Sequence, residues 1–134
     1  FAVRNSGATA VIEGAGDHCC EYMTGGQVVI LGEVGANFGA GMTGGFSYVL
    51  DEKKSFFDKC NRELINLDRV LSETMDPHRQ NLKLLIKEHY KNTNSLKAKE
   101  ILVDFERYLP YFWLVSPVAL SVNDLLKATT ANAA

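Results

Sequence analysis

Basic residues are scarce in the first part of the sequence, and this scarcity limits what that part can bind. Of 14 Lys and Arg residues, only Arg4 lies in the first 50 positions, which also hold Glu13, Asp17, Glu21 and Glu33. One base against four acids gives this segment a charge of −3, without the cations that neutralise phosphates in nucleic-acid complexes. The whole chain has a net charge of −2, so we expect neither a nucleic-acid partner nor a general attraction to anionic lipid.

Long apolar runs are absent, and cysteines are few. No stretch approaches the ~20 apolar residues of a membrane-spanning helix, and no secretory leader pattern is present, so no membrane contact is expected. Cys19, Cys20 and Cys60 are an odd number of cysteines, which cannot form a closed disulfide framework and favours a reducing compartment. The run His18-Cys19-Cys20 lacks the C-x-x-C spacing of zinc sites, so no metal site is predicted.

Catalytic signatures are missing too. Gly39, Gly41 and Gly44 spell G-x-G-x-x-G, but the next residues, Phe46–Leu50, are typical of a strand and not of the helix that a dinucleotide site requires. His89 falls on the apolar stripe of an expected helix, with no acid or nucleophile placed beside it by spacing, and it is interpreted as a packed histidine. We therefore expect no catalytic, cofactor-binding or metal-binding residue in this chain.

What is present is glycine, and only in the first third. All 11 glycines lie at or before Gly45, and all 3 prolines lie after it. Met23-Thr24-Gly25-Gly26 recurs 19 residues later as Met42-Thr43-Gly44-Gly45. The same offset aligns three glycine-led apolar rows: Gly7–Ile12, Gly26–Leu31 and Gly45–Leu50. A repeat of this length indicates stacked supersecondary units.

The repeat predicts the turns of a right-handed parallel β-helix, a solenoid. About 19 extended residues cover roughly 60 Å at ~3.3 Å per residue, which suits one coil of short strands and corners. Stacked coils place equivalent residues above one another, so we expect Val11, Ile30 and Val49 to form one ladder. The glycines are interpreted as turn residues that need a positive φ or have no room for a side chain: Gly7, Gly16, Gly26, Gly35 and Gly45. The continuous apolar strands, such as Val28–Leu31, predict burial on both faces.

The rest of the chain predicts mostly helices. We expect residues 1–52 to be the last turns of the solenoid and residues 53–134 to be an α-helical extension that packs on it, with a frayed tail from about 128. Residues 56–71 are expected to be irregular with a helical turn or two. Asp76-Pro77 predicts a helix start that runs to Asn92–Asn94, and a further helix is expected from Ser95 to Pro110. Residues 111–115 are expected to be extended, with Phe112-Trp113 an apolar anchor.

The sequence also resembles a known family. The C-terminal GXGXG domain of the glutamate synthase large subunit is similar over nearly the whole chain, up to about Ser116. The matching segments are Arg4–Ala8, Glu13–Gly26, Gly39–Gly45, Leu82–His89, Lys99–Leu102 and Leu109-Pro110-x-Phe112. The paired cysteines and Leu109-Pro110-x-Phe112-Trp113 look more like the ferredoxin-dependent type. Because the chain opens at Phe1 in what looks like strand, we expect it to be part of a longer polypeptide.

The resemblance implies a structural role. In this family the whole enzyme makes two glutamates from glutamine and 2-oxoglutarate, with ammonia passing through an internal channel to an FMN site and an iron–sulfur cluster supplying electrons. The resemblance implies that the FMN site and the iron–sulfur cluster lie upstream and that this domain holds the glutaminase and synthase regions in place. It also implies that the electron donor is ferredoxin or a pyridine-nucleotide-linked small subunit. Expected partners are the other domains of the same subunit, in the cytoplasm or, for a photosynthetic eukaryote, the plastid stroma. The alternatives are a GXGXG subunit of another redox assembly, such as formylmethanofuran dehydrogenase, and a free-standing nucleotide-binding protein.

Overall fold

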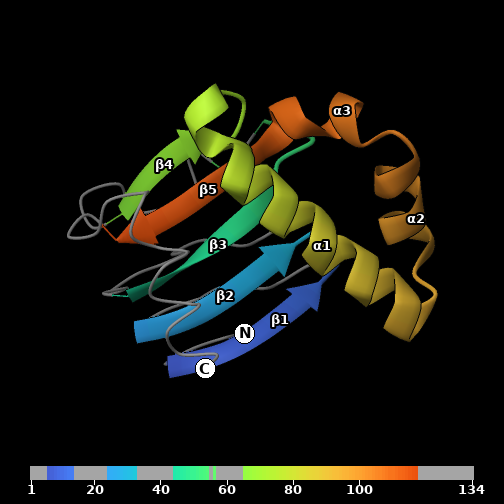
Figure 1. The fold of residues 1–134 in the computed structure, drawn as a ribbon, viewed down its shortest axis with the longest axis horizontal. Coiled ribbons are helices and arrows are strands. Elements are labelled where there is room, and N and C mark those ends of the chain that lie inside the picture. The colour runs from blue at the N-terminus through green and yellow to red at the C-terminus, as the bar shows by residue number, and fades with distance from the viewer. Residues whose placement is uncertain (1–5, 14–23, 33–43, 55, 57–64, 118–134) are drawn as a thin grey trace.

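The computed structural model describes residues 6–13, 24–32, 44–54, 56 and 65–117. These residues form an α/β arrangement, in which one mixed sheet of five strands is covered on one face by helices (Figure 1). The sheet order is β1-β2-β3-β5-β4. The strands are β1 (Ser6–Ile12), β2 (Thr24–Ile30), β3 (Gly44–Leu50), β4 (Ile65–Arg69) and β5 (Phe112–Pro117).

The three glycine-led rows form the parallel part of the sheet, as the repeat predicts. β1 pairs with β2 and β2 with β3, both in parallel. Between β2 and β3 the offset is 19, and Ile30 lies opposite Val49 as expected. The segments that would close the coils, 14–23 and 33–43, lie outside the described residues, so the described part establishes parallel strands without a complete β-helix.

The predicted ladder is wrong by one residue between β1 and β2. Val11 lies opposite Val29, and Ile12 lies opposite Ile30, because the register shifts between Ser6 and Thr9. A shift of one residue moves side chains to the other face of a sheet. The shift therefore places Val11 with the apolar cluster under the helices and Ile12 with the cluster on the opposite face.

Two glycines sit where the register changes. Gly26 has a φ of 85° and Gly45 a φ of 73°, a backbone conformation that side chains with a Cβ rarely adopt. Gly7 differs, because a Cβ built there would meet nothing within 4 Å. Gly16 and Gly35 lie outside the described residues, so the expected turn role of these glycines as a group stays a prediction.

The segment after residue 64 corrects the expectation of an irregular, helical stretch. Ile65–Arg69 is strand β4, which pairs antiparallel with β5, and β5 pairs antiparallel with β3. The part of the chain after residue 53 is therefore not wholly helical, since it adds two strands to the sheet. Ile65-Asn66-Leu67-Asp68 alternates apolar and polar residues, a short strand signal that the expectation of an irregular stretch did not use. The pairing of Leu67 with Val115 is a long-range contact that local pattern cannot predict.

The helices begin and end close to the predicted boundaries. After a short 3₁₀ helix (Glu73–Met75), α1 (Asp76–Thr93) begins one residue earlier than expected, with Met75 at the N-cap position. Asn94 ends it in the left-handed conformation, with φ 55°. Ser95 caps α2 (Leu96–Val103) by accepting a hydrogen bond from the Ala98 N–H at 3.1 Å.

The second helix is interrupted, contrary to the expectation of one helix up to Pro110. Asp104, with φ −133°, breaks it into α2 and α3 (Phe105–Tyr108), and a 3₁₀ helix (Leu109–Tyr111) follows. The break lets Phe105, Tyr108 and Leu109 all turn into the core. Residues 112–117 are extended, which confirms the prediction for 112–115, whereas Tyr111 ends the 3₁₀ helix instead.

The core lies on both faces of the sheet. The larger cluster joins the strands to the helices, through residues such as Val29, Phe46, Leu82, Ile86 and Ile101. A second cluster on the opposite face contains Val28, Ile30, Val49, Phe56, Ile65 and Val115. The predicted burial of both faces of the central strands is thereby confirmed: Val28–Leu31 are all 0% exposed.

Candidate functional site

A chain of polar side chains crosses the interface between the sheet and α1. Gln27 on β2 donates from Nε2 to the Thr9 hydroxyl at 3.2 Å. Asn81 on α1 donates from Nδ2 to Gln27 Oε1 and to the Tyr48 hydroxyl, both at 3.0 Å. The Tyr48 hydroxyl also lies 2.8 Å from Nδ1 of His78. These hydrogen bonds connect β1, β2, β3 and α1 inside an otherwise apolar layer.

Three members of this polar chain are held away from water, whereas Thr9 is exposed and Asn81 is half-buried. Tyr48 is 0%, His78 3% and Gln27 8% exposed. Burial raises the pKa of Tyr48 well above its ordinary value of 10.0, and the hydrogen bond from Asn81 opposes this only in part. Because the Tyr48 oxygen accepts from Asn81, its own proton is directed to Nδ1 of His78, which then acts as an acceptor. The phenol therefore stays protonated and links two side chains of the same helix to β3.

The aromatic rings around His78 complete a packed site. Phe46 and Tyr48 meet edge to face with centroids 5.4 Å apart, and each ring centroid lies 5.8 Å from that of His78. Such geometry adds to the stability from area burial. Since no cavity opens onto these rings among the hollows lined by described residues, the arrangement is suited to fixing α1 on the sheet and not to binding a substrate.

A second polar cluster lies where β3 ends. Asp51 is 8% exposed, and its carboxylate accepts from the Phe56 N–H and from Nε1 of Trp113, each at 3.2 Å. The Arg69 guanidinium lies 3.4 Å from the centroid of the Trp113 ring, and it donates to the Pro110 carbonyl at 3.0 Å. Burial lowers the pKa of Arg69, and the charge of Asp51 opposes the shift. Trp113 is therefore an anchor between strands, as predicted for the Phe112-Trp113 pair.

His89 lies at the rim of the interface between α1 and β1. Its side chain is 11% exposed, and its Nε2 lies 3.7 Å from the Glu13 carboxylate. The two side chains form an ion pair only when the imidazole ring is protonated. His89 borders a hollow of about 230 Å³, which is lined by Thr9, Ala10, Val11, Leu85, Glu88, His89, Asn92 and Thr93. No nucleophile lies among these residues beyond the Thr hydroxyls, so the geometry offers no catalytic pair of the kind that general-base catalysis requires.

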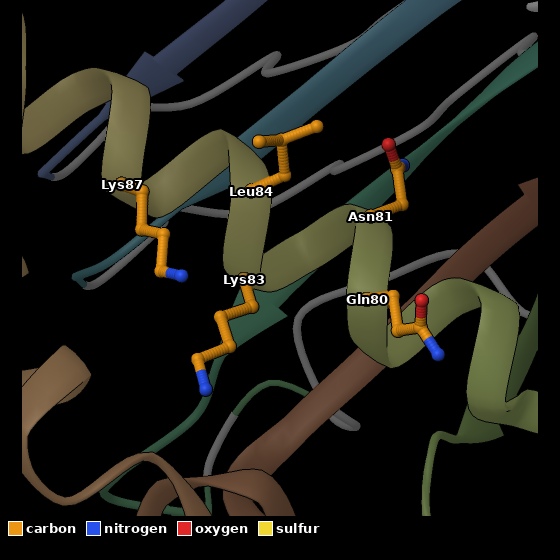
Figure 2. A pocket seen from close by; sticks show the side chains of 5 residues that line it. All are labelled: Gln80, Asn81, Lys83, Leu84 and Lys87. Atoms are coloured by element: carbon orange, nitrogen blue, oxygen red, sulfur yellow. The ribbon is translucent and has the colours of Figure 1, made fainter.

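A larger hollow follows the exposed side of α1. It has a volume of about 410 Å³ and is lined by Gln80, Asn81, Lys83, Leu84 and Lys87 (Figure 2). Gln80 is also bonded to the Asp76 carboxylate at 2.7 Å. Asn81 therefore belongs both to this surface and to the buried polar chain.

The structure agrees with the interpretation that the G-x-G-x-x-G run does not lead into a helix, at the residues that it describes. Gly44 and Gly45 begin β3, so a strand and not a helix follows the glycines. The described residues hold no group of three or more His, Cys, Asp or Glu side chains placed to bind a metal. Cys19, Cys20 and Cys60 lie outside the described residues. Within the described ranges no helix has both the length and the apolarity to cross a membrane.

The sequence reasoning missed the polar chain almost entirely. Gln27 and Asn81 were the available signals, because each is an uncharged amide next to a row of apolar residues. His78 was a further signal, because it lies four residues before Leu82 and so extends the apolar stripe of Leu82, Leu85 and Ile86 by one turn. Its burial depends on Tyr48, which is 30 residues away in the sequence.

Comparison with known proteins agrees with this architecture. The family model described as the GXGXG motif matches residues 1–118, so the chain belongs to the GXGXG family. Over 117 residues, 87% of this chain, it is 54% identical to the chloroplastic ferredoxin-dependent glutamate synthase of Spinacia oleracea. The same identity and coverage hold for ferredoxin-dependent glutamate synthase 1 of Arabidopsis thaliana and ferredoxin-dependent glutamate synthase 2 of Synechocystis sp..

These relatives are much longer than this chain, which covers 7% of the length of each. The expected resemblance to the GXGXG domain of glutamate synthase is confirmed, and the relatives are of the ferredoxin-dependent type. The named activity belongs to those proteins as wholes.

Proposed function

We propose that this chain is a structural domain of a ferredoxin-dependent glutamate synthase. In this role it is a part of a parallel β-helix that holds the glutaminase and FMN-containing synthase regions in a fixed relation, and it contributes no catalytic residue itself. The reaction of the whole enzyme would be the conversion of glutamine and 2-oxoglutarate to two glutamates, with electrons from ferredoxin. The plastid stroma, or the cytoplasm in a bacterium, is the proposed compartment.

The observation that supports this role best is where the polar side chains are used. Of the buried polar groups, Tyr48, His78, Gln27 and Asp51 all bond to other parts of the same fold. A catalytic site instead collects titratable groups in a concave, accessible pocket. Both faces of β2 and β3 are buried, as is typical of strands inside a larger assembly.

The cofactors of the proposed parent enzyme do not fit the described residues. An iron–sulfur cluster needs several thiolates; Cys19, Cys20 and Cys60 lie outside the described residues, so the place of the cluster follows from the family resemblance, which puts it upstream. FMN needs a phosphate-binding group of backbone N–H donors, such as a helix N-terminus after glycines; here β3 follows the glycines instead. FMN and the cluster are therefore assigned to other parts of the longer protein.

Equilibrium dialysis tests the proposal against the nucleotide-binding alternative. The chain, dialysed against FMN and separately against NADPH, should retain neither above the level of an albumin control. Saturable binding of either nucleotide would overturn the structural role. A second assay would measure ammonia release from glutamine: the chain should match a blank, and release that is abolished in Cys19→Ala would contradict the proposal.

A further inference from the structure

The exposed side of α1 carries a basic hollow that the fold itself does not use. Figure 2 shows the side chains of Lys83 and Lys87 leaving the helix on one side, and those of Leu84 and Asn81 on the other. Together with Gln80 they line the hollow of about 410 Å³. Leu84 is 54% exposed, so this surface joins one large apolar side chain to two cations.

The charges of this basic hollow are not neutralised by neighbouring acids. The ion pairs between described residues join other side chains, such as Lys97 with Glu52 and Arg79 with Asp76. Glu88, the acid closest to Lys87 in the sequence, lines the hollow beside β1 instead. The Lys83 ammonium lies 5.6 Å from the centroid of the Phe105 ring, which can orient it but cannot neutralise it.

The basic hollow has a fixed floor. Asn81 donates to both Gln27 and Tyr48, so the turn of α1 that carries Gln80 to Leu84 is bonded to the sheet. Leu82 and Leu85, the apolar neighbours within this turn, are 0% and 5% exposed. A surface that is already ordered loses little conformational entropy when it binds a partner.

We propose that the basic hollow binds an acidic segment from another part of the same longer polypeptide, with carboxylates at Lys83 and Lys87 and an apolar side chain against Leu84. This inference rests on the proposed function as a structural domain. The occupant is chosen for two reasons. The two exposed ammonium groups, which pair with no described acid, favour an acidic partner by charge complementarity. In addition, 93% of the relatives' length lies outside the part that this chain matches, since the chain covers 7%.

Zero-length cross-linking of the longer protein tests this proposal. Carbodiimide joins a lysine amine to a carboxylate only when the two are in contact, and mass spectrometry then identifies both residues. We expect Lys83 or Lys87 to be joined to an Asp or Glu outside residues 1–134 of the same polypeptide. The yield should fall several-fold between about 0.05 M and 0.5 M salt, because salt screens exposed charge pairs. Cross-links only within residues 1–134, only to a separate protein, or none at all would overturn the proposal.

Charge reversal supplies a second measurement. The variant Lys83→Glu/Lys87→Glu should expose the hollow, so that Leu84 reacts faster in protein footprinting. Lys99→Glu on α2 is the matched control, because Lys99 is exposed and does not line the hollow. Equal footprints for both variants would contradict the proposal. A longer protein with unchanged Lys83 and Lys87 that has glutamate synthase activity but shows no such cross-link refutes the basic hollow alone, whereas a longer protein without that activity refutes the proposed function.

Discussion

Removing the Tyr48 hydroxyl tests the claim that the polar chain locks α1 to the sheet. In Tyr48→Phe the ring still fills its place in the core, but two hydrogen bonds are lost, at 2.8 Å to His78 and at 3.0 Å from Asn81. His78 is 3% exposed, so its Nδ1 would be left without this donor in a dry site. Asn81 is only half-buried, and water can replace the lost bond there.

The expected loss of stability follows from the different exposure of His78 and Asn81. A buried polar group left unsatisfied costs about 1–3 kcal/mol, and a replaceable hydrogen bond contributes about 0.5–1.5 kcal/mol. We expect Tyr48→Phe to lower the free energy of unfolding by about 2–3 kcal/mol. With a urea m-value of about 1–3 kcal/mol per M, the midpoint should fall by about 0.7–3 M.

The assay is urea unfolding, followed by circular dichroism and by the fluorescence of Trp113, the only tryptophan. Tyr108→Phe is the matched control: Tyr108 donates at 3.0 Å to Glu100, whose carboxylate is exposed and can be hydrated instead. Its effect should stay below about 1 kcal/mol. Equal effects of the two substitutions, or a double-mutant cycle in which Tyr48→Phe and Asn81→Ala add without coupling, would refute the reasoning.

Three further predictions concern the pH dependence of the Tyr48 contribution, two glycines with positive φ, and the cap of α2. Burial raises the pKa of Tyr48 in the folded state above its ordinary value of 10.0, so its contribution to stability should be complete below pH 10 and should decline above it, by up to about 1.4 kcal/mol per pH unit. The difference in unfolding free energy between the wild type and Tyr48→Phe should therefore shrink above pH 10. A constant difference up to pH 11 would contradict this prediction. Gly26→Val and Gly45→Val should each lower the free energy of unfolding by about 2 kcal/mol or more, because φ values of 85° and 73° strain a β-branched residue. Gly7→Ala should change the melting temperature little, since its Cβ meets open space. Similar melting temperatures for all three variants would contradict the backbone argument. Ser95→Ala should cost about 1 kcal/mol in thermal or urea unfolding, since it removes the bond to the Ala98 N–H at 3.1 Å, and Ser95→Asp, which retains a cap acceptor, should restore most of that loss.

Local chemistry in the sequence accounts for much of the fold. The spaced glycines and apolar rows predicted three parallel strands, because a sequence repeat places the same backbone demands at each copy. Asp76-Pro77 and Ser95 predicted helix starts to within a residue, because caps act within a single turn. The burial of Val28–Leu31 on both faces was also correctly predicted.

Long-range pairing accounts for what the sequence could not predict. The alternation Ile65-Asn66-Leu67-Asp68 is a short strand signal, but it does not show that Leu67 pairs with Val115, 48 positions further along. The shift between Ser6 and Thr9 depends on which face each side chain of β1 can bury, which is decided only after the helices cover the sheet. His78 likewise joins the polar chain only because α1 crosses β3 at Tyr48.

The coupling of glutamine hydrolysis to glutamate formation is the most direct test of the structural role. In the longer protein, Asn81→Ala should loosen α1 from β2 and β3 without touching any reacting group, with Lys99→Gln as the control. The account predicts that glutamine hydrolysis continues in Asn81→Ala while the glutamate formed per glutamine consumed falls below that of the control. A variant that loses glutamine hydrolysis and glutamate formation in equal proportion, with its stability unchanged, would contradict the account.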